Sequence, residues 1–141
     1  MCCLSFAVVE INSCQNLTKE GETYVLTGDI ISPTIACIKI EVDKITLDCR
    51  GHTIIGNITP TLGPSGASGV VSRKNNYITI KNCDIQNFRD GISLSSTNYG
   101  HIINNTLTLN RREGLRFSFD SNHNLISSNI ITHNYYTGIY F

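Results

Sequence analysis

The sequence has no excess of charge of either sign and none of the motifs that mark common catalytic or metal-binding sites. Its 141 residues include 11 basic and 11 acidic side chains, so the formal net charge is zero. Without a basic excess the chain has no electrostatic footprint for nucleic acid, and we expect no nucleic-acid partner. It contains no nucleophile elbow, phosphate-binding loop, zinc-ligand spacing or catalytic triad. We therefore expect neither a cofactor nor a metal site.

Long apolar runs and amphipathic stretches of helical length are also missing. The apolar opening, residues 1–9, is too short to cross a membrane, so we expect no transmembrane span. Two interpretations of residues 1–10 stay open. Ser5-Phe6-Ala7 fits the small-x-small pattern that precedes signal-peptide cleavage, and the same stretch also fits a cap strand.

The sequence does contain a repeat of 22 to 24 residues. Residues 80–85, 102–107 and 126–131 share the pattern apolar-x-x-(Asn/Cys)-x-apolar. Each copy is followed by a glycine, at Gly91, Gly114 or Gly138, and then by apolar residues at alternating positions. A fixed period of this length indicates a solenoid, in which each repeat buries its apolar face against its neighbours.

The segments between the matched positions are short, β-branched and alternately apolar and polar, which is typical of strands. A leucine-rich repeat shares the period and is the rival fold. That repeat needs an apolar residue two positions before the first core position, where two of the three copies have Gly100 and Asn124. The pattern therefore predicts an all-β chain, a right-handed three-faced parallel β-helix of about five coils.

Asparagines recur at fixed coil positions, and we predict that they are structural. Asparagine suits left-handed turn positions, and stacked amides can hydrogen-bond from coil to coil. The predicted ladder residues are Asn76, Asn98 and Asn122, then Asn87, Asn110 and Asn134, and finally Asn105 and Asn129.

Residues 11–141 read as a single domain with one loop insertion, because residues 57–68 carry two prolines and two glycines. The last repeat reaches Phe141 without a polar cap. Uncovered strand edges can pair with further strands, so we expect self-association through the ends of the β-helix.

Six cysteines in a chain of this size favour an oxidising, extracellular location. Cys14 and Cys37 flank the first coil and are the best disulfide candidates. Cys49 and Cys83 fall at nearly the same coil position, and could bridge adjacent coils or lie buried as small apolar residues. We favour burial without a bond. Three sequons, at Asn16, Asn57 and Asn104, are candidates for glycosylation.

Residues 21–30, 36–40 and 45–54, which include the run Leu47-Asp48-Cys49-Arg50-Gly51-His52, resemble right-handed parallel β-helix repeat proteins of the NosD-like group. The resemblance covers about residues 11 to 141. It implies a secreted or cell-surface protein. It implies little about activity, because the group includes polysaccharide lyases, epimerases, hydrolases and surface-layer-associated proteins.

Arg89-Asp90 and Arg112-Glu113 occupy equivalent places before Gly91 and Gly114, and are the weak catalytic candidates. Paired carboxylates beside arginines could bind a uronate or act as acid and base on a glycan. The third repeat has Tyr136-Thr137 there, so we favour a solvated turn with alternating charges.

A second candidate surface is a sugar-stacking face made by Tyr77, Tyr99, Tyr135, Tyr136 and Tyr140, although scattered surface tyrosines are the favoured interpretation. The prediction is therefore a non-enzymatic extracellular β-helix with a structural, adhesive or self-assembling role. The alternatives are a carbohydrate-active enzyme (lyase, hydrolase or epimerase) and a glycan-binding module, which makes a glycan the possible partner.

Overall fold

The computed structural model describes residues 7–33, 36–57 and 68–141, and its strands form three parallel sheets. Sheet A contains β1 (Val8–Ile11), β3 (Thr23–Leu26), β6 (Thr46–Asp48), β9 (Thr79–Lys81), β12 (His101–Ile103) and β15 (Leu125–Ser127). Sheet C contains β4 (Ile30–Ile31), β7 (Thr53–Ile55), β10 (Asp84–Gln86), β13 (Thr106–Thr108) and β16 (Ile130–Thr132). Sheet B contains β2 (Gln15–Leu17), β5 (Ile38–Ile40), β8 (Ser68–Arg73), β11 (Asp90–Ser95), β14 (Glu113–Ser118) and β17 (Thr137–Tyr140).

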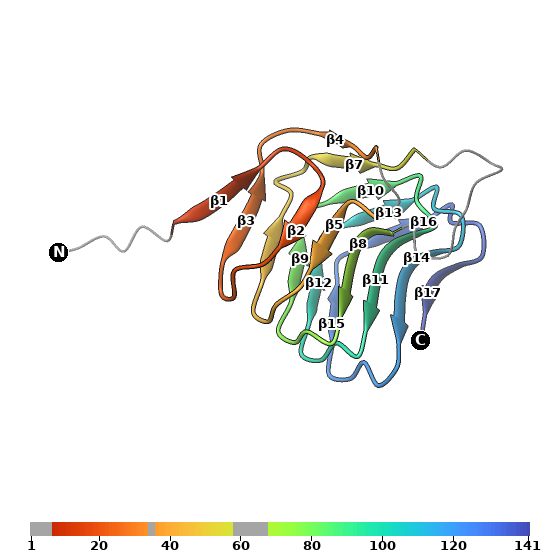
Figure 1. Cartoon of the computed structure of the whole chain (residues 1–141). Helices are drawn as coiled ribbons and strands as arrows, with labels where there is room; N and C mark the ends of the chain where they lie inside the picture. The colour runs from red at the N-terminus through yellow and green to blue at the C-terminus, as the bar shows by residue number, and fades with distance from the viewer. Residues whose placement is uncertain (1–6, 34–35, 58–67) are drawn as a thin grey trace.

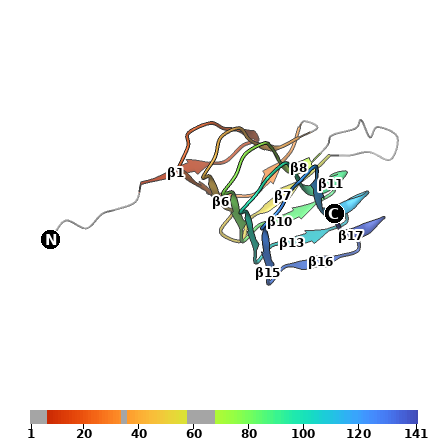
Figure 2. The same cartoon turned by 90° about the horizontal axis from the view of Figure 1, so that it is seen from below.

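From β3 onward the chain visits sheets A, C and B in turn, and each strand pairs with the strand of the next coil. In sheet A, for example, Ile80 pairs with Ile102, which pairs with Ile126. Successive coils lie side by side from β1 to β17 (Figure 1), and a view from below shows the three walls that they build (Figure 2). The predicted three-faced parallel β-helix is confirmed.

The core is a set of aliphatic columns between the three sheets. Because side chains alternate along a strand, the inward residue of each short strand stacks on its counterparts in neighbouring coils. Leu47, Ile54, Ile85, Val70 and Ile92 are all fully buried in this way. Full burial of one such side chain contributes about 1.5–3 kcal/mol. The repeated columns therefore supply most of the stabilisation.

Asparagine side chains connect the coils at two inner corners. The Asn105 amide donates to Asn129 Oδ1 and to the Ile80 carbonyl, both at 3.0 Å, and Asn105 Oδ1 accepts from the Cys83 amide at 3.0 Å. Asn110 repeats this pattern with Asn134. At a third corner, Asn76 Oδ1 accepts from the Asn98 amide. The Asn122 amide in turn donates to Asn98 Oδ1.

Asn87 does not belong to this ladder, and its predicted place in it is wrong. Its backbone has φ 60°, like Leu109 and His133, and Phe88 occupies the ladder position above Asn110. The cause is that this turn is one residue shorter than the equivalent turn of the next coil: Ile85 pairs with Leu107, but Ile92 pairs with Leu115. Counting back from the glycine therefore misplaces Asn87 by one position. Left-handed turn residues also precede the ladder asparagines, as Asn104 (φ 55°) precedes Asn105.

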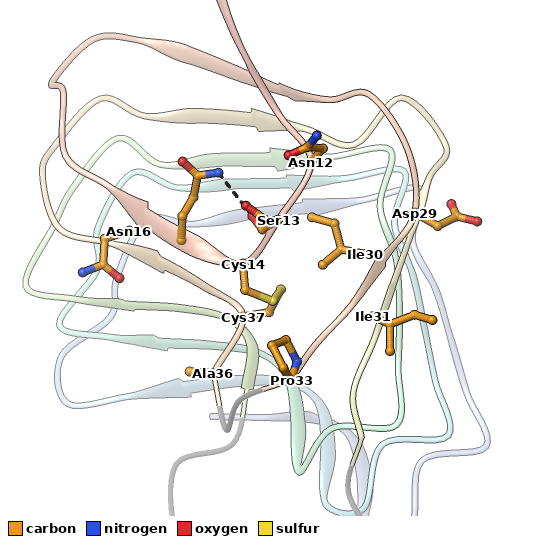
Figure 3. A pocket seen from close by; sticks show the side chains of 11 residues that line it. Asn12, Ser13, Cys14, Asn16, Asp29, Ile30, Ile31, Pro33, Ala36 and Cys37 are labelled. Atoms are coloured by element: carbon orange, nitrogen blue, oxygen red, sulfur yellow. Dashed lines mark hydrogen bonds between the residues drawn. A yellow bond between two sulfur atoms is a disulfide. The ribbon is translucent and has the colours of Figure 1, made fainter.

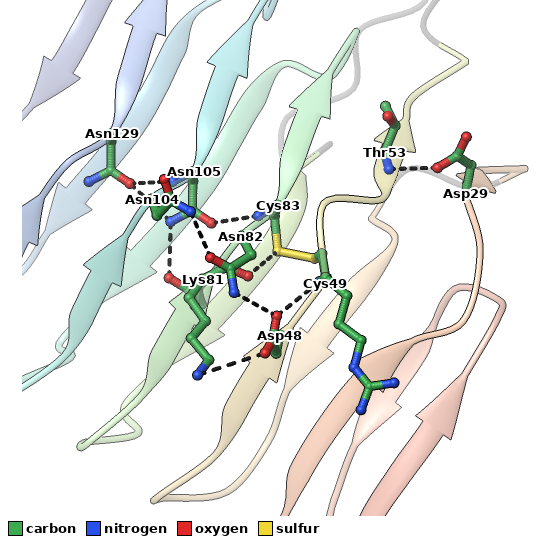
Figure 4. The surroundings of a disulfide bond; sticks show 12 residues. Asp29, Asp48, Cys49, Thr53, Lys81, Asn82, Cys83, Asn104, Asn105 and Asn129 are labelled. Carbon is green, nitrogen blue, oxygen red and sulfur yellow. Dashed lines mark hydrogen bonds and ion pairs between the residues drawn. A yellow bond between two sulfur atoms is a disulfide. The ribbon is translucent and has the colours of Figure 1, made fainter.

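Within the described residues, two disulfides join neighbouring coils. The predicted Cys14–Cys37 bond is confirmed, and it joins the residue before β2 to the residue before β5. Cys49 and Cys83 also form a bond, so their predicted burial without one is wrong (Figure 4). Both are buried, and their Cα atoms are 4.8 Å apart. This coil-to-coil spacing itself lies within the range that a disulfide requires, so stacked cysteines can bond without rearrangement.

Candidate functional site

A groove with a volume of about 680 Å³ lies on the outer face of sheet B, over β8, β11 and β14. Four basic side chains line it, together with several serine hydroxyls and one exposed phenylalanine. The basic residues are Arg73, Lys74, Arg89 and Arg116; the serines include Ser93, Ser95 and Ser118; the phenylalanine is Phe119. A volume of this size is typical of sites that hold small ligands.

Strand alternation places these side chains outside. Ile92 and Leu94 point into the core, so Ser93 and Ser95 between and after them point into the groove. Pairing aligns Ser93 with Arg116, and Ser95 with both Arg73 and Ser118. The groove therefore presents columns of donors that repeat at the coil spacing, about 4.8 Å.

The groove is electropositive. Arg73, Lys74 and Arg89 form no ion pair with any residue that the structure describes. Arg116 Nη1 lies 4.0 Å from Glu113 Oε2. A concave surface with uncompensated positive charge concentrates anions near it.

Asp90 also lines this groove, and Glu113 holds the equivalent place on the next coil; both are buried, so the interpretation of a solvated turn is wrong for both carboxyls. The two residues open β11 and β14, where strand pairing stacks them in one column with Ser68 and Thr137. Asp90 is 4% exposed and Glu113 is 3% exposed. They are buried because β11 and β14 begin at these two residues, before the glycines. Both carboxyls therefore lie within the sheet.

Burial is the main reason that the pKa of Glu113 is raised above its ordinary value. A hydrogen bond to the Asp90 side chain and the charge of Asp90 act in the same direction, whereas Arg112 and Arg116 oppose it. Arg112 Nη2 lies 3.4 Å from Glu113 Oε1. Asp90 and Glu113 thus form an acid pair whose members interact across neighbouring coils.

The acid pair has unused hydrogen-bonding capacity. Asp90 Oδ1 and Glu113 Oε2 have no hydrogen-bond partner among the described residues. Common glycoside hydrolases hold two carboxyls about 5–9.5 Å apart, so that the sugar or a water fits between them. Asp90 and Glu113 are almost fully buried, so they present little carboxyl surface to a sugar in the groove.

Comparison with known families agrees with the stacked parallel strands. Residues 30–141, most of the chain, match the family described as the right handed beta helix region. The chain belongs to the right-handed β-helix family. No curated protein and no solved structure matches it. In the described ranges of this β-helix, no helix is long and apolar enough to cross a membrane.

Asp48 and Asp84, elsewhere in the β-helix, have structural partners. Asp48 Oδ1 accepts from the Arg50 amide and the Asn82 side chain, both at 2.9 Å, beside the Cys49–Cys83 bond (Figure 4). Asp84 accepts from the Thr53 hydroxyl, and burial raises its pKa. Among the described residues, no group of three or more His, Cys, Asp or Glu side chains could hold a metal ion.

A smaller pocket of about 420 Å³ lies at the N-terminal end of the stack, beside the Cys14–Cys37 bond (Figure 3). It opens because β1 leads directly to β2, without a strand in sheet C. Its wall includes Ile31, and its one acidic side chain, Asp29, accepts from the Thr53 amide. The pocket offers little chemistry of its own.

The tyrosines do not form one face. Tyr77 and Tyr99 lie in the turns before β9 and β12, whereas Tyr135 and Tyr136 lie between β16 and β17. Tyr140, in β17, stacks under the Arg116 guanidinium at 5.3 Å. They therefore occupy separate corners and walls.

The three sequons stay predictions. The Asn16 side chain donates to Glu41 Oε1, and the Asn104 side chain donates to Asn82 Oδ1. Asn57 is exposed, but most of the predicted insertion at residues 57–68 lies outside the described residues, as do Ser5 and Phe6 of the predicted cleavage pattern.

The arginines predicted beside the acids have different roles from each other. Arg89 lines the groove, whereas Arg112 contacts Glu113 and lies over the Tyr136 ring at 5.8 Å. Sequence reasoning missed Arg73, Arg116 and Phe119. The alternation after each glycine could have identified Arg116, because it marks that position as outward-facing.

Proposed function

We propose that this β-helix is a non-enzymatic extracellular protein with an adhesive role, which binds an acidic glycan in the groove of sheet B. The observation that carries the proposal is the set of uncompensated cations at Arg73, Lys74 and Arg89 on neighbouring coils. The arginine guanidinium donates paired hydrogen bonds to a carboxylate, and it can donate to other oxyanions in the same way. A polymer with a negative charge on successive sugars matches such a series of cations.

Other groups in the groove favour a sugar over a simple anion. Ser93, Ser95 and Ser118 offer hydroxyls that can donate to and accept from sugar hydroxyls. Phe119 is 78% exposed, and its ring offers an apolar surface for the carbon face of a pyranose. Extracellular placement is supported by the two disulfides, which persist in oxidising compartments.

Binding without cleavage is favoured by the burial of the acid pair, because Asp90 and Glu113 are 4% and 3% exposed and offer a glycan little carboxyl surface. Four basic side chains line the groove, so it attracts an anion. A carbohydrate-active enzyme remains the alternative function, and it predicts turnover of the same ligand.

Calorimetric titration with uronate oligosaccharides and with neutral oligosaccharides of equal length tests the proposal. We expect binding of the acidic series only, weakening as salt rises because the charges are exposed. The double variant Arg73→Ala/Arg89→Ala should bind at least about tenfold more weakly, since charge-assisted hydrogen bonds contribute about 1.5–3 kcal/mol each.

Lys44→Ala is the matched control, because Lys44 pairs with Glu20 in a turn outside the groove. It should leave affinity unchanged. Equal binding of neutral and acidic series would overturn the proposal, and release of new reducing or unsaturated ends would favour the enzymatic alternative.

A further inference from the structure

Tyr77 and Tyr99 form a stacked pair of exposed rings on neighbouring coils. Their ring centroids are 5.2 Å apart and their planes differ by 11°. The side chains are 53% and 47% exposed. The residues lie at the same place in the turns before β9 and β12, turns that run side by side in Figure 1.

The backbone holds this pair in register. Tyr77 has φ 57° and Tyr99 has φ 56°, a conformation that non-glycine residues seldom adopt. The Tyr77 amide donates to the Asn98 carbonyl, so the two turns are also hydrogen-bonded to each other. The rings therefore stay adjacent at a cost in backbone energy that the coil stack offsets.

The pair also lies at a junction between coils that follows two disulfide-linked junctions. Cys14–Cys37 joins the coils of β2 and β5, and Cys49–Cys83 joins those of β6 and β9. No disulfide in the described parts of the chain joins the coil of β9 to the coil of β12. Tyr77 and Tyr99 lie at this junction.

We propose that Tyr77 and Tyr99 are an oxidative cross-linking site, coupled to dityrosine by a haem peroxidase and hydrogen peroxide. The peroxidase removes one electron and one proton from each phenol, and the two phenoxyl radicals form a carbon–carbon bond between ring positions ortho to the hydroxyls. Each ring then loses the hydrogen from its bonded carbon and regains its phenolic proton. In sum, two hydrogen atoms leave and one hydrogen peroxide becomes two water molecules.

The other tyrosines are less well placed for this reaction within one chain. Tyr24 is buried. The rings of Tyr135 and Tyr136 meet edge-on, with an interplanar angle of 67°. Proximity on rigid turns gives Tyr77 and Tyr99 a high effective concentration, so coupling between them should precede coupling between molecules. His123 covers the other face of Tyr99 at 5.1 Å and is the competing partner.

The test treats the dilute 141-residue chain with a haem peroxidase and one equivalent of hydrogen peroxide. We expect a monomer lighter by two hydrogen atoms, dityrosine fluorescence, and a cross-linked peptide that joins Tyr77 to Tyr99. Tyr99→Phe keeps the stack but removes one phenol, and should abolish all three signals. Tyr135→Phe, the matched control, should keep them.

Unfolding in denaturant gives a second measurement. Oxidation should move the midpoint of the wild-type chain upward, because a cross-link restricts the unfolded state, and should not move that of Tyr99→Phe. A Tyr99–His123 adduct, dimers linked through Tyr135 or Tyr136 with Tyr77 unmodified, or a link that survives in Tyr99→Phe would each overturn the proposal.

Discussion

At the scale of single residues, the acid pair shows how a strand start changes the chemistry of a side chain. Asp90 and Glu113 precede glycines, which in the sequence suggests a turn in water. In the fold each glycine is inside a strand: a Cβ on Gly91 would lie 2.6 Å from the Gly114 carbonyl oxygen. The close approach of two backbones therefore requires glycine there, and it also brings the preceding carboxyls together.

Stability should depend on pH through Glu113. Its pKa in the folded chain is raised above the unfolded value, near 4.5, so the folded state holds the proton more tightly. Its contribution to stability is complete below the unfolded pKa and is lost as pH rises through the folded pKa. Glutamine in Glu113→Gln has nearly the same shape but cannot ionise. The variant should therefore lack the part of the fall in stability with rising pH that Glu113 causes.

Urea unfolding midpoints from pH 4 to pH 8 check this expectation. The wild-type curve should fall relative to that of Glu113→Gln as pH rises. Glu20→Gln, at an exposed ion pair with Lys44, is the control and should track the wild type. Parallel curves for wild type and Glu113→Gln would show that the buried carboxyl does not control the pH dependence.

At the scale of elements, the turn between sheets C and B marks the limit of sequence counting. Counting back four residues from the glycine correctly predicts the ladder positions of Asn110 and Asn134. Asn87 has the same spacing but lies one position earlier in its coil, because its turn is one residue shorter. A repeat pattern predicts strands and their inward faces. The length of each turn is set by local packing, which at this turn involves the buried side chain of Phe88.

The Cys49–Cys83 bond fastens the end of β6 to that of β9, and its removal should be costly. Loop-closure entropy for a 34-residue separation predicts a loss of about 3–4 kcal/mol from the free energy of unfolding. The double variant Cys49→Ala/Cys83→Ala should show this loss in denaturant unfolding.

Reduction of the wild type under the same conditions is the comparison for this variant. Dithiothreitol should lower wild-type stability further than it lowers the variant's, which has lost one of the two disulfides of the described residues and keeps Cys14–Cys37. If the variant unfolded at the wild-type midpoint, or if reduction affected both proteins equally, the bond would not have this stabilising role.

At the scale of the whole molecule, burial is uneven along the stack. The inward residues of β8 and β11 are fully buried, whereas β17 is exposed along its length. Ile130 is 61% exposed and Phe141, stacked on Phe117 at 5.4 Å, is largely exposed. β15, β16 and β17 are the edge strands of their three sheets at this end of the stack, and we propose that they carry self-association.

Hydrogen exchange of the 141-residue chain at two concentrations tests this proposal. Amides of β15–β17 should exchange faster than those of β8 and β11 in dilute solution, because fewer apolar contacts hold them. They should gain protection as concentration rises, because a second molecule can pair with the free strand edges. Exchange that is independent of concentration would contradict self-association through this surface.

The sequence by itself determined the class of fold, because a β-helix repeats a local pattern that can be counted along the chain. The period, the alternation within each strand, the Asn105 and Asn129 ladder and the Cys14–Cys37 bond all follow from that pattern. Only the tertiary structure decided the burial of Asp90 and Glu113, the basic groove, the Cys49–Cys83 bond and the Tyr77–Tyr99 stack. Each of these depends on which residues of two coils meet at one register and on whether they are buried there, and neither is a local property of the chain.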